Sequence, residues 1–171
     1  MKTISMTLDT ASIDAAIAEL NRYRDEFLGK CRRLREMVAE RIRWRAEAGF
    51  SFAMVNDMVD GSDGTVNDVT VDVTHEDNVS IVFTHGTQAV FIEFGAGVYH
   101  NGPVGQSPHP WGAQFGDTIG GYGKGHGKYD VWRIPGGGLT YGTPAEMPMY
   151  RGMQAAIQAI DEMVREVFGN D

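Results

Sequence analysis

The chain has 171 residues, a length typical of one domain, and its 42% hydrophobic and 22% charged residues exclude a wholly disordered chain. The net charge of −8 argues against a general nucleic-acid binder, because such proteins use an excess of Lys and Arg to neutralise phosphates. Residues 1–7 lack the apolar core of a secretory signal, and no apolar run reaches the roughly 18 residues of a transmembrane helix. A single cysteine, Cys31, cannot form an internal disulfide and fits synthesis in a reducing cytoplasm. We therefore expect one domain over residues 1–171.

The charge is unevenly distributed along the chain. Residues 22–45 hold nine basic and four acidic side chains, a balance of +5, so the remainder carries −13. Two interpretations stay open. The segment is either a surface that attracts an acidic partner, such as the acidic half of a neighbouring copy, or a solvated helix face with ion pairs between residues four apart.

Residues about 10–46 are predicted to form a long N-terminal helix or two stacked ones. Thr10 or Ser12 is the expected N-cap, and Gly29 is a possible kink. The apolar residues recur at alternating steps of four and three, a narrow stripe that Arg24 alone interrupts and that is typical of a coiled-coil seam. The stripe residues are Ile13, Ile17, Leu20, Phe27, Cys31, Leu34 and Val38. This pattern predicts a partner helix.

An antiparallel sheet of about four strands is predicted after residue 60. Residues 69–73 and 79–83 alternate apolar and polar side chains, and the apolar run at 89–94 is the expected third strand. The connections are too short for parallel crossovers, so a meander is expected. Residues 129–134 are the expected fourth strand. Residues 50–59 fit a strand or a short helix equally well.

A long glycine-rich loop follows, and then a second helix. Between residues 95 and 142, 15 of 48 residues are glycine, and we expect an arm over about 95–128 that orders against other subunits. Its aromatic residues are expected anchors. The C-terminal amphipathic helix is predicted to begin between Pro144 and Pro148 and to continue through Phe168. The fold class is therefore expected to be α+β.

Patterns for catalysis, cofactors and metals are missing from the sequence. Residues 120–128 match neither phosphate-binding glycine pattern, and no nucleophile elbow occurs. The five histidines, His75, His85, His100, His109 and His126, lack the short spacing of metal ligands. We expect no enzyme activity, no cofactor and no metal. Glu93 is the one carboxylate inside an apolar run, and the strand alternation predicts that it is exposed or lies between subunits; if buried, it could act as an acid or base.

Two segments carry a resemblance to a phage family. Val90–Gly97 (VFIEFGAG) resembles an apolar-Glu-Phe-Gly-small signature, and Gly142–Arg151 (GTPAEMPMYR) resembles a Pro-Ala-x-x-Pro-apolar-apolar-Arg entry into a C-terminal helix. These signatures, in this order, are similar to those of the neck or tail-completion family of long-tailed phages, typified by the gene-product-ten protein of coliphage HK-97. In typical members the two signatures lie closer together than they do here.

The resemblance implies a structural virion protein that helps to join head and tail, present in the virion neck or tail and, during assembly, in the host cytoplasm. The implied partners are copies of the chain in a ring and neighbouring connector, terminator or tail-tube proteins, with no sequence-specific nucleic acid and no membrane. The expected subunit-contact residues are Glu93, Phe94, Gly95, Trp111, Phe115, Tyr122, Trp132, Pro144, Pro148 and Arg151. Three alternatives remain: a tail-terminator ring subunit, a metal- or phosphate-dependent enzyme that uses the glycine- and histidine-rich loop, and a DNA binder that uses residues 22–45.

Overall fold

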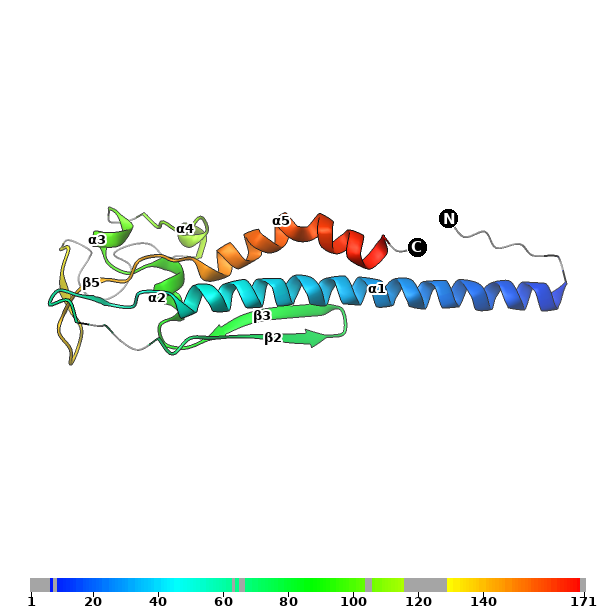
Figure 1. Ribbon diagram of the computed structural model, residues 1–171, viewed down its shortest axis with the longest axis horizontal. Coiled ribbons are helices and arrows are strands. Elements are labelled where there is room, and N and C mark those ends of the chain that lie inside the picture. The colour runs from blue at the N-terminus through cyan, green and yellow to red at the C-terminus, as the bar shows by residue number, and fades with distance from the viewer. Residues whose placement is uncertain are drawn as a thin grey trace.

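The computed structural model describes residues 7, 9–62, 64, 67–103, 106–115 and 129–169. It confirms an α+β fold, with a long N-terminal helix, two small antiparallel sheets and a long C-terminal helix. The molecule is elongated (Figure 1). One long helix runs along most of its length, the C-terminal helix lies along one side of that helix, and a β-hairpin lies along the other.

The N-terminal helix α1 is a single helix over Thr10–Ser51, about 60 Å long. It continues through Gly29 without interruption, so the predicted kink is wrong. The N-cap is Asp9, whose side chain accepts a hydrogen bond of 2.9 Å from the Ser12 backbone N–H, in place of the predicted Thr10 or Ser12. The buried residues of α1 are Ala16, Ala39, Ala46 and Phe50. All of these but Ala16 lie in the C-terminal half, which packs on α5 and the hairpin and belongs to the body, while the N-terminal half projects beyond it as a stalk (Figure 1).

The hairpin is confirmed, but the expected third strand is wrong. Strands β2 (Thr70–Glu76) and β3 (Val79–His85) pair antiparallel, and residues 89–94 form the helix α2 (Ala89–Phe94). Ala89, Ile92 and Glu93 are its buried residues, at the spacing that places side chains on one helical face. A continuous apolar run of six residues fits a buried strand or a buried helix turn, and here tertiary packing selects the helix.

A second sheet replaces the predicted four-strand meander. Strands β1 (Asp57–Met58), β5 (Leu139–Gly142) and β4 (Trp132–Arg133) form a three-stranded antiparallel sheet in the order β1-β5-β4. The expected strand at 129–134 is thus reduced to two residues. The central strand β5 lies at the end of the glycine-rich segment, at residues 139–142, which were not expected to form a strand.

The C-terminal helix α5 spans Pro148–Phe168, as predicted, and packs closely on α1. At the crossing, a Cβ added to Gly152 would lie 2.8 Å from the Ile42 carbonyl oxygen, so the absence of a side chain there permits the close approach. The core cluster joins α1, the hairpin and α2, and consists of Ala46, Phe50, Val55, Val71 and Ile92. Two short helices, α3 (Val98–Asn101) and α4 (Gly112–Phe115), complete the described chain. None of the helices in the described ranges is both long and apolar enough to cross a membrane.

Candidate functional site

The two segments that carry the family resemblance lie against each other. The backbones of Ala96 and Thr143 form an antiparallel bridge, with N–H to O distances of 2.8 and 2.9 Å. The Glu146 N–H donates to the Ile92 carbonyl at 2.9 Å. Residues about 50 positions apart in the sequence thus form one structure, which we call the motif junction (residues 92–97, 101, 109 and 143–150).

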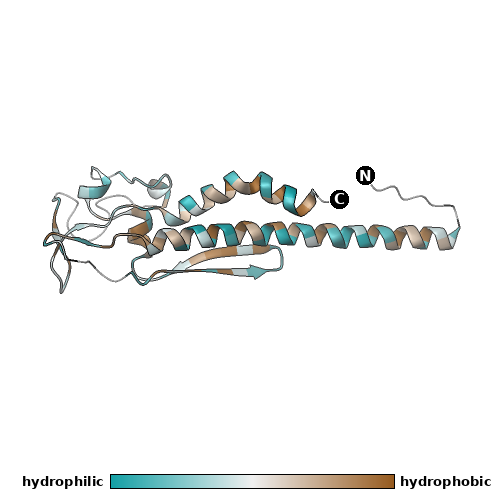
Figure 2. Ribbon diagram, in the orientation of Figure 1, coloured by the Kyte–Doolittle hydropathy of each residue, from teal (hydrophilic) through white to brown (hydrophobic). Residues whose placement is uncertain are grey.

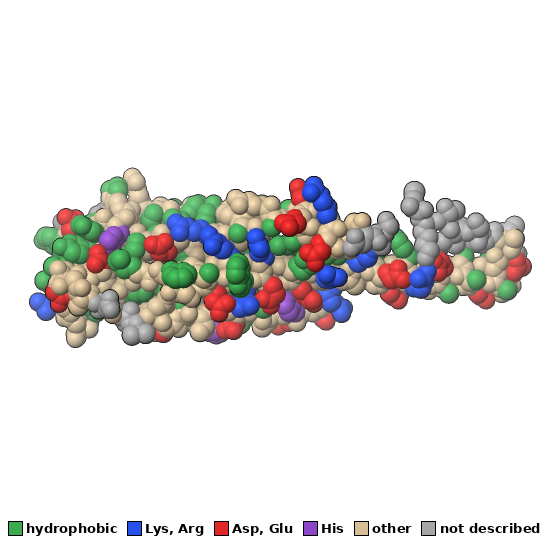
Figure 3. Space-filling view, viewed as in Figure 1, with side chains coloured by type: hydrophobic (Ala, Val, Ile, Leu, Met, Phe, Trp, Pro, Cys, Tyr) green, Lys and Arg blue, Asp and Glu red, His purple; other side chains and the backbone are tan. Residues whose placement is uncertain are grey.

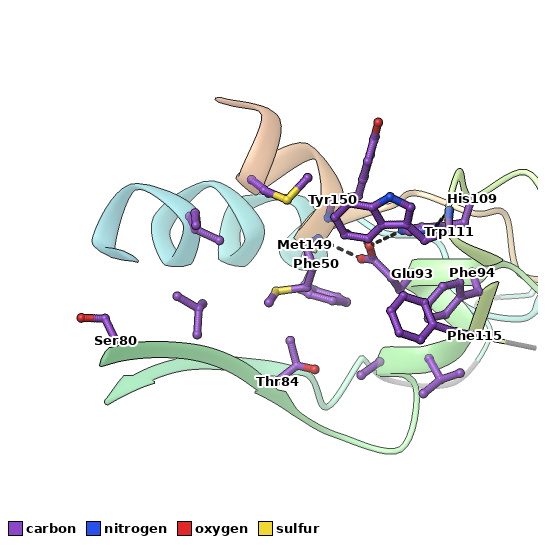
Figure 4. Close-up of a pocket in the computed structure, with 15 residues that line it drawn as sticks. Phe50, Ser80, Thr84, Glu93, Phe94, His109, Trp111, Phe115, Met149 and Tyr150 are labelled. Atoms are coloured by element: carbon purple, nitrogen blue, oxygen red, sulfur yellow. Dashed lines mark hydrogen bonds and ion pairs between the residues drawn. The ribbon is translucent and has the colours of Figure 1, made fainter. Parts of the chain in front are cut away.

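Glu93 is the centre of the motif junction. Its carboxylate accepts hydrogen bonds from the Met149 N–H at 2.8 Å and from the Tyr150 N–H at 3.0 Å. These are first-turn amides of α5, which have no acceptor within their own helix, and the N-cap residue Met147 makes no side-chain cap. Glu93 therefore caps α5 from a distant part of the chain, with its negative charge at the positive end of the helix dipole (Figure 4).

The burial of Glu93 corrects a prediction from the sequence. The residue is 7% exposed, so the expectation that it is exposed is wrong. The physical reason is that α2 is a helix, which places Glu93 beside the buried Ile92 and not on an outer strand face.

His109 completes the hydrogen bonds of this carboxylate. Its Nε2 lies 3.0 Å from Glu93 Oε1, and its Nδ1 accepts a hydrogen bond of 3.0 Å from the Trp111 backbone N–H. Because Nδ1 is an acceptor, the imidazole is the neutral tautomer with its proton on Nε2. The ring of Phe94 packs at 4.5 Å between centroids and that of Tyr150 at 5.3 Å. With both nitrogens occupied, His109 offers no free base for catalysis.

Asn101 makes a second set of bonds across the motif junction. Its Nδ2 donates to the carbonyls of Ala96, Gly97 and Thr143 at 3.2, 3.0 and 2.8 Å, and its Oδ1 accepts from the Ala145 N–H at 2.7 Å. Its side chain also explains Gly95, which has a φ of 81°, because a Cβ there would lie 2.4 Å from Asn101 Oδ1. The sequence analysis missed Asn101, and no periodicity or motif signal marks it.

An apolar cavity of about 490 Å³ opens beside the motif junction, between the hairpin, α1, α2 and the start of α5. Trp111 and Phe115 line it from the loop side (Figure 4). The Trp111 ring packs edge-on against Tyr150, with 5.4 Å between centroids. This packing holds Trp111 at the rim of the cavity, where it is 39% exposed. Phe115, 64% exposed at the end of α4, lines the same cavity.

The structure brings some of the predicted contact residues together and separates others. Phe94, Gly95, Trp111 and Pro148 lie at or beside the motif junction. Pro144 is a half-buried residue of the junction. Arg151 is exposed and forms an ion pair of 3.3 Å with Glu146.

Trp132, in β4, does not line the cavity, but its indole Nε1 lies beside Gly97 of the motif junction, 3.4 Å from where a Cβ on that glycine would stand. Tyr122 lies outside the described residues, as do the rest of 116–128 and His126. Within the described ranges, no group of three or more His, Cys, Asp or Glu side chains is arranged to hold a metal ion. His100 contacts one carboxylate, Asp57, at 3.0 Å.

Comparison with known proteins finds no relative of the chain. No protein-family model, no curated protein and no solved structure matches the chain.

Proposed function

We propose that the chain is a structural virion protein of a tailed phage or prophage, a neck or tail-completion subunit that helps to join head and tail. The observation that carries the proposal is the motif junction. The two segments that resemble the family's signatures, Val90–Gly97 and Gly142–Arg151, are bound to each other through Glu93 and Asn101. Two short segments that are far apart in the sequence but form one structural unit support a fold shared with the family better than two isolated short matches would.

The surface of the second sheet supports an assembly role. Large apolar side chains are exposed on or next to this sheet, at the end of the body opposite the stalk (Figure 3). These residues, which together we call the sheet-end patch, are Val59, Tyr99, Tyr129, Trp132 and Leu139. They lie on both faces of the sheet, because Trp132 shares the face of its cross-strand partner Thr140 and Leu139 points to the opposite face. Exposed apolar patches on small proteins mark sites where other proteins bind. Phe52, 91% exposed just after α1, adds to the apolar surface of the body.

The charge of the chain is compatible with a position around the DNA channel. A net charge of −8 disfavours tight binding of phosphates, which suits a subunit past which DNA must move.

Electron microscopy of particles from a phage that lacks this gene tests the proposal. We expect filled, tailless heads beside free tails of normal length. Free tails of variable length would instead assign the chain to the tail-terminator ring, and intact virions would overturn both roles.

A further inference from the structure

The imidazole of His109 connects two parts of the chain through hydrogen bonds of opposite direction. Its Nε2 donates to Glu93 Oε1 at 3.0 Å, and its Nδ1 accepts from the Trp111 backbone N–H at 3.0 Å. The other hydrogen bonds that residues 107–115 make with described residues stay within that segment. The His109 ring is therefore the described polar link between the segment that carries Trp111 and the helix α2.

A second proton on this ring would change the two hydrogen bonds in opposite ways. An imidazolium is a donor at both nitrogens, so Nε2 still donates to Glu93, now as an ion pair. Nδ1 can no longer accept, and its N–H would face the Trp111 N–H at the same short distance. The Trp111 amide makes no other hydrogen bond with the described residues, so protonation leaves it without an acceptor.

Glu93 is the only charged side chain that faces the His109 ring among the described residues. It is also the one charged residue of α2, an otherwise hydrophobic helix (Figure 2), and within the described chain no Lys or Arg pairs with its carboxylate. An imidazolium would supply the missing counter-charge to this buried group. Phe94 and Trp111, whose rings pack against His109, do not titrate, and the phenol of Tyr150 carries no charge near neutral pH.

The other elements around the ring bring no titratable group. Residues 107–115 contain none besides His109, and the α1 and hairpin residues that line the adjoining cavity are apolar or carry hydroxyls. The balance between one lost and one strengthened hydrogen bond is thus set by His109 and Glu93.

We propose that His109 is a pH-sensitive switch: the neutral ring holds residues 107–115 on the motif junction, and the protonated ring releases the Trp111 amide. Glu93 keeps its hydrogen bonds to the start of α5 in both states. Acid therefore loosens the segment at the rim of the cavity while the cap of α5 stays in place. The switch does not rest on the proposed virion role, because it follows from these contacts alone.

Two substitutions of His109 separate the two ends of the ring. In His109→Asn, the side-chain oxygen accepts from the Trp111 N–H, since Asn commonly bonds the backbone N–H two residues further on. In His109→Gln, the longer side chain offers an amide donor to Glu93 and has no acceptor at the position of Nδ1. Neither side chain titrates. We therefore expect the Trp111 amide to be bonded at every pH in His109→Asn and unbonded at every pH in His109→Gln.

Water–amide exchange, measured by NMR on the full chain from about pH 8 to about pH 5, tests the switch, because histidine imidazoles gain their proton in this range. In the wild type, we expect the protection factor of the Trp111 amide to match that of His109→Asn at the upper end. It should fall about fivefold, to that of His109→Gln, at the lower end, the change expected for one hydrogen bond. A wild-type protection factor that stays constant, or an equal fall in His109→Asn, would overturn the proposal.

His100→Asn is the matched control, because it removes another histidine that contacts a carboxylate, at 3.0 Å from Asp57. It should leave the fall at Trp111 unchanged, and loss of the fall in this variant would overturn the role of His109. The Met149 and Tyr150 amides, which Glu93 caps, should stay protected in the wild type across the range. Their exposure together with that of Trp111 would show unfolding of the whole junction and not release of one segment, which would also overturn the proposal.

Discussion

Glu93 and His109 are joined by a hydrogen bond of 3.0 Å, with both side chains withdrawn from solvent. The same carboxylate holds the first turn of α5 through two backbone amides. The Glu93 side chain therefore connects three parts of the chain by hydrogen bonds: its own helix α2, the loop that carries Trp111, and the start of α5. These hydrogen bonds hold the motif junction together, and they explain why a Glu occupies this position of the VFIEFGAG segment.

Glu93→Gln should lower the free energy of unfolding by about 2 kcal/mol, because hydrogen bonds to a charged acceptor contribute about 1.5–3 kcal/mol. The Gln side-chain amide keeps one acceptor oxygen, but its NH₂ group would face backbone or imidazole N–H groups that donate to the Glu93 carboxylate in the wild type. Urea denaturation followed by circular dichroism measures the change. Glu146→Gln, at a more exposed carboxylate paired with Arg151, is the control and should stay within about 0.5 kcal/mol. Equal losses in the two variants would contradict the capping role of Glu93.

The parts of the fold predicted correctly are those governed by local periodicity. The long stripe of α1 and the proline-bracketed start of α5 each contain many residues at helical spacing, and the hairpin has two alternating strands. The run at 89–94 is too short to separate a strand from a helix, and the error in the position of Glu93 follows from that one assignment. Asn101 could not be predicted, because two of its four partners, Thr143 and Ala145, reach it only in the folded chain, and the other two, Ala96 and Gly97, precede its own short helix α3.

Gly95→Ala should destabilise the protein by about 1–3 kcal/mol, because alanine is strained at a φ of 81° and its Cβ would collide with the Asn101 side chain. Asn101 cannot move aside without losing its own hydrogen bonds. Gly29→Ala is the matched control, since its Cβ would meet no atom within 4 Å and it lies inside α1.

The control should change stability in the opposite direction, with a gain of about 0.5–1 kcal/mol from helix propensity. Thermal or urea unfolding measures both variants. A neutral Gly95→Ala would show that the close approach of Asn101 is not required for the fold.

Asp68 should contribute stability that is lost in acid. Its carboxylate accepts hydrogen bonds of 3.1 Å from the Thr87 N–H and hydroxyl, and the backbone bond is the main cause that holds the pKa of Asp68 below its ordinary value of 3.8. A pKa that is lower in the folded than in the unfolded chain stabilises the protein above pH 3.8, and this contribution disappears as the pH falls through the folded value.

We therefore expect the Asp68→Asn variant to have a lower free energy of unfolding than the wild type at neutral pH, and the difference between the two free energies to become smaller below pH 3.8. Urea denaturation at several pH values across this range measures both free energies. Asp161→Asn, which removes an exposed carboxylate of α5, controls for the change in net charge. A constant difference between Asp68→Asn and the wild type at every pH would contradict the role of the Asp68 charge.

Trp132→Ala should impair head–tail joining without unfolding the subunit. Trp132 lies in the short strand β4 within the sheet-end patch, 36% exposed, and aromatic residues at the centre of an interface contribute most to its affinity. Loss of a contact of about 2 kcal/mol lowers affinity about 30-fold.

Trp44→Ala removes the same kind of side chain from α1, where Trp44 is 61% exposed and lies outside the sheet-end patch, and it is the matched control. Complementation of a phage that lacks the gene, scored as the yield of infectious particles, compares the two variants, with thermal unfolding to show that both fold. A full yield of infectious particles from Trp132→Ala would show that this side chain of the sheet-end patch is dispensable for assembly. An equal loss of yield from Trp44→Ala would show that the effect is not specific to the patch. Either result would contradict the sheet-end patch as the assembly surface.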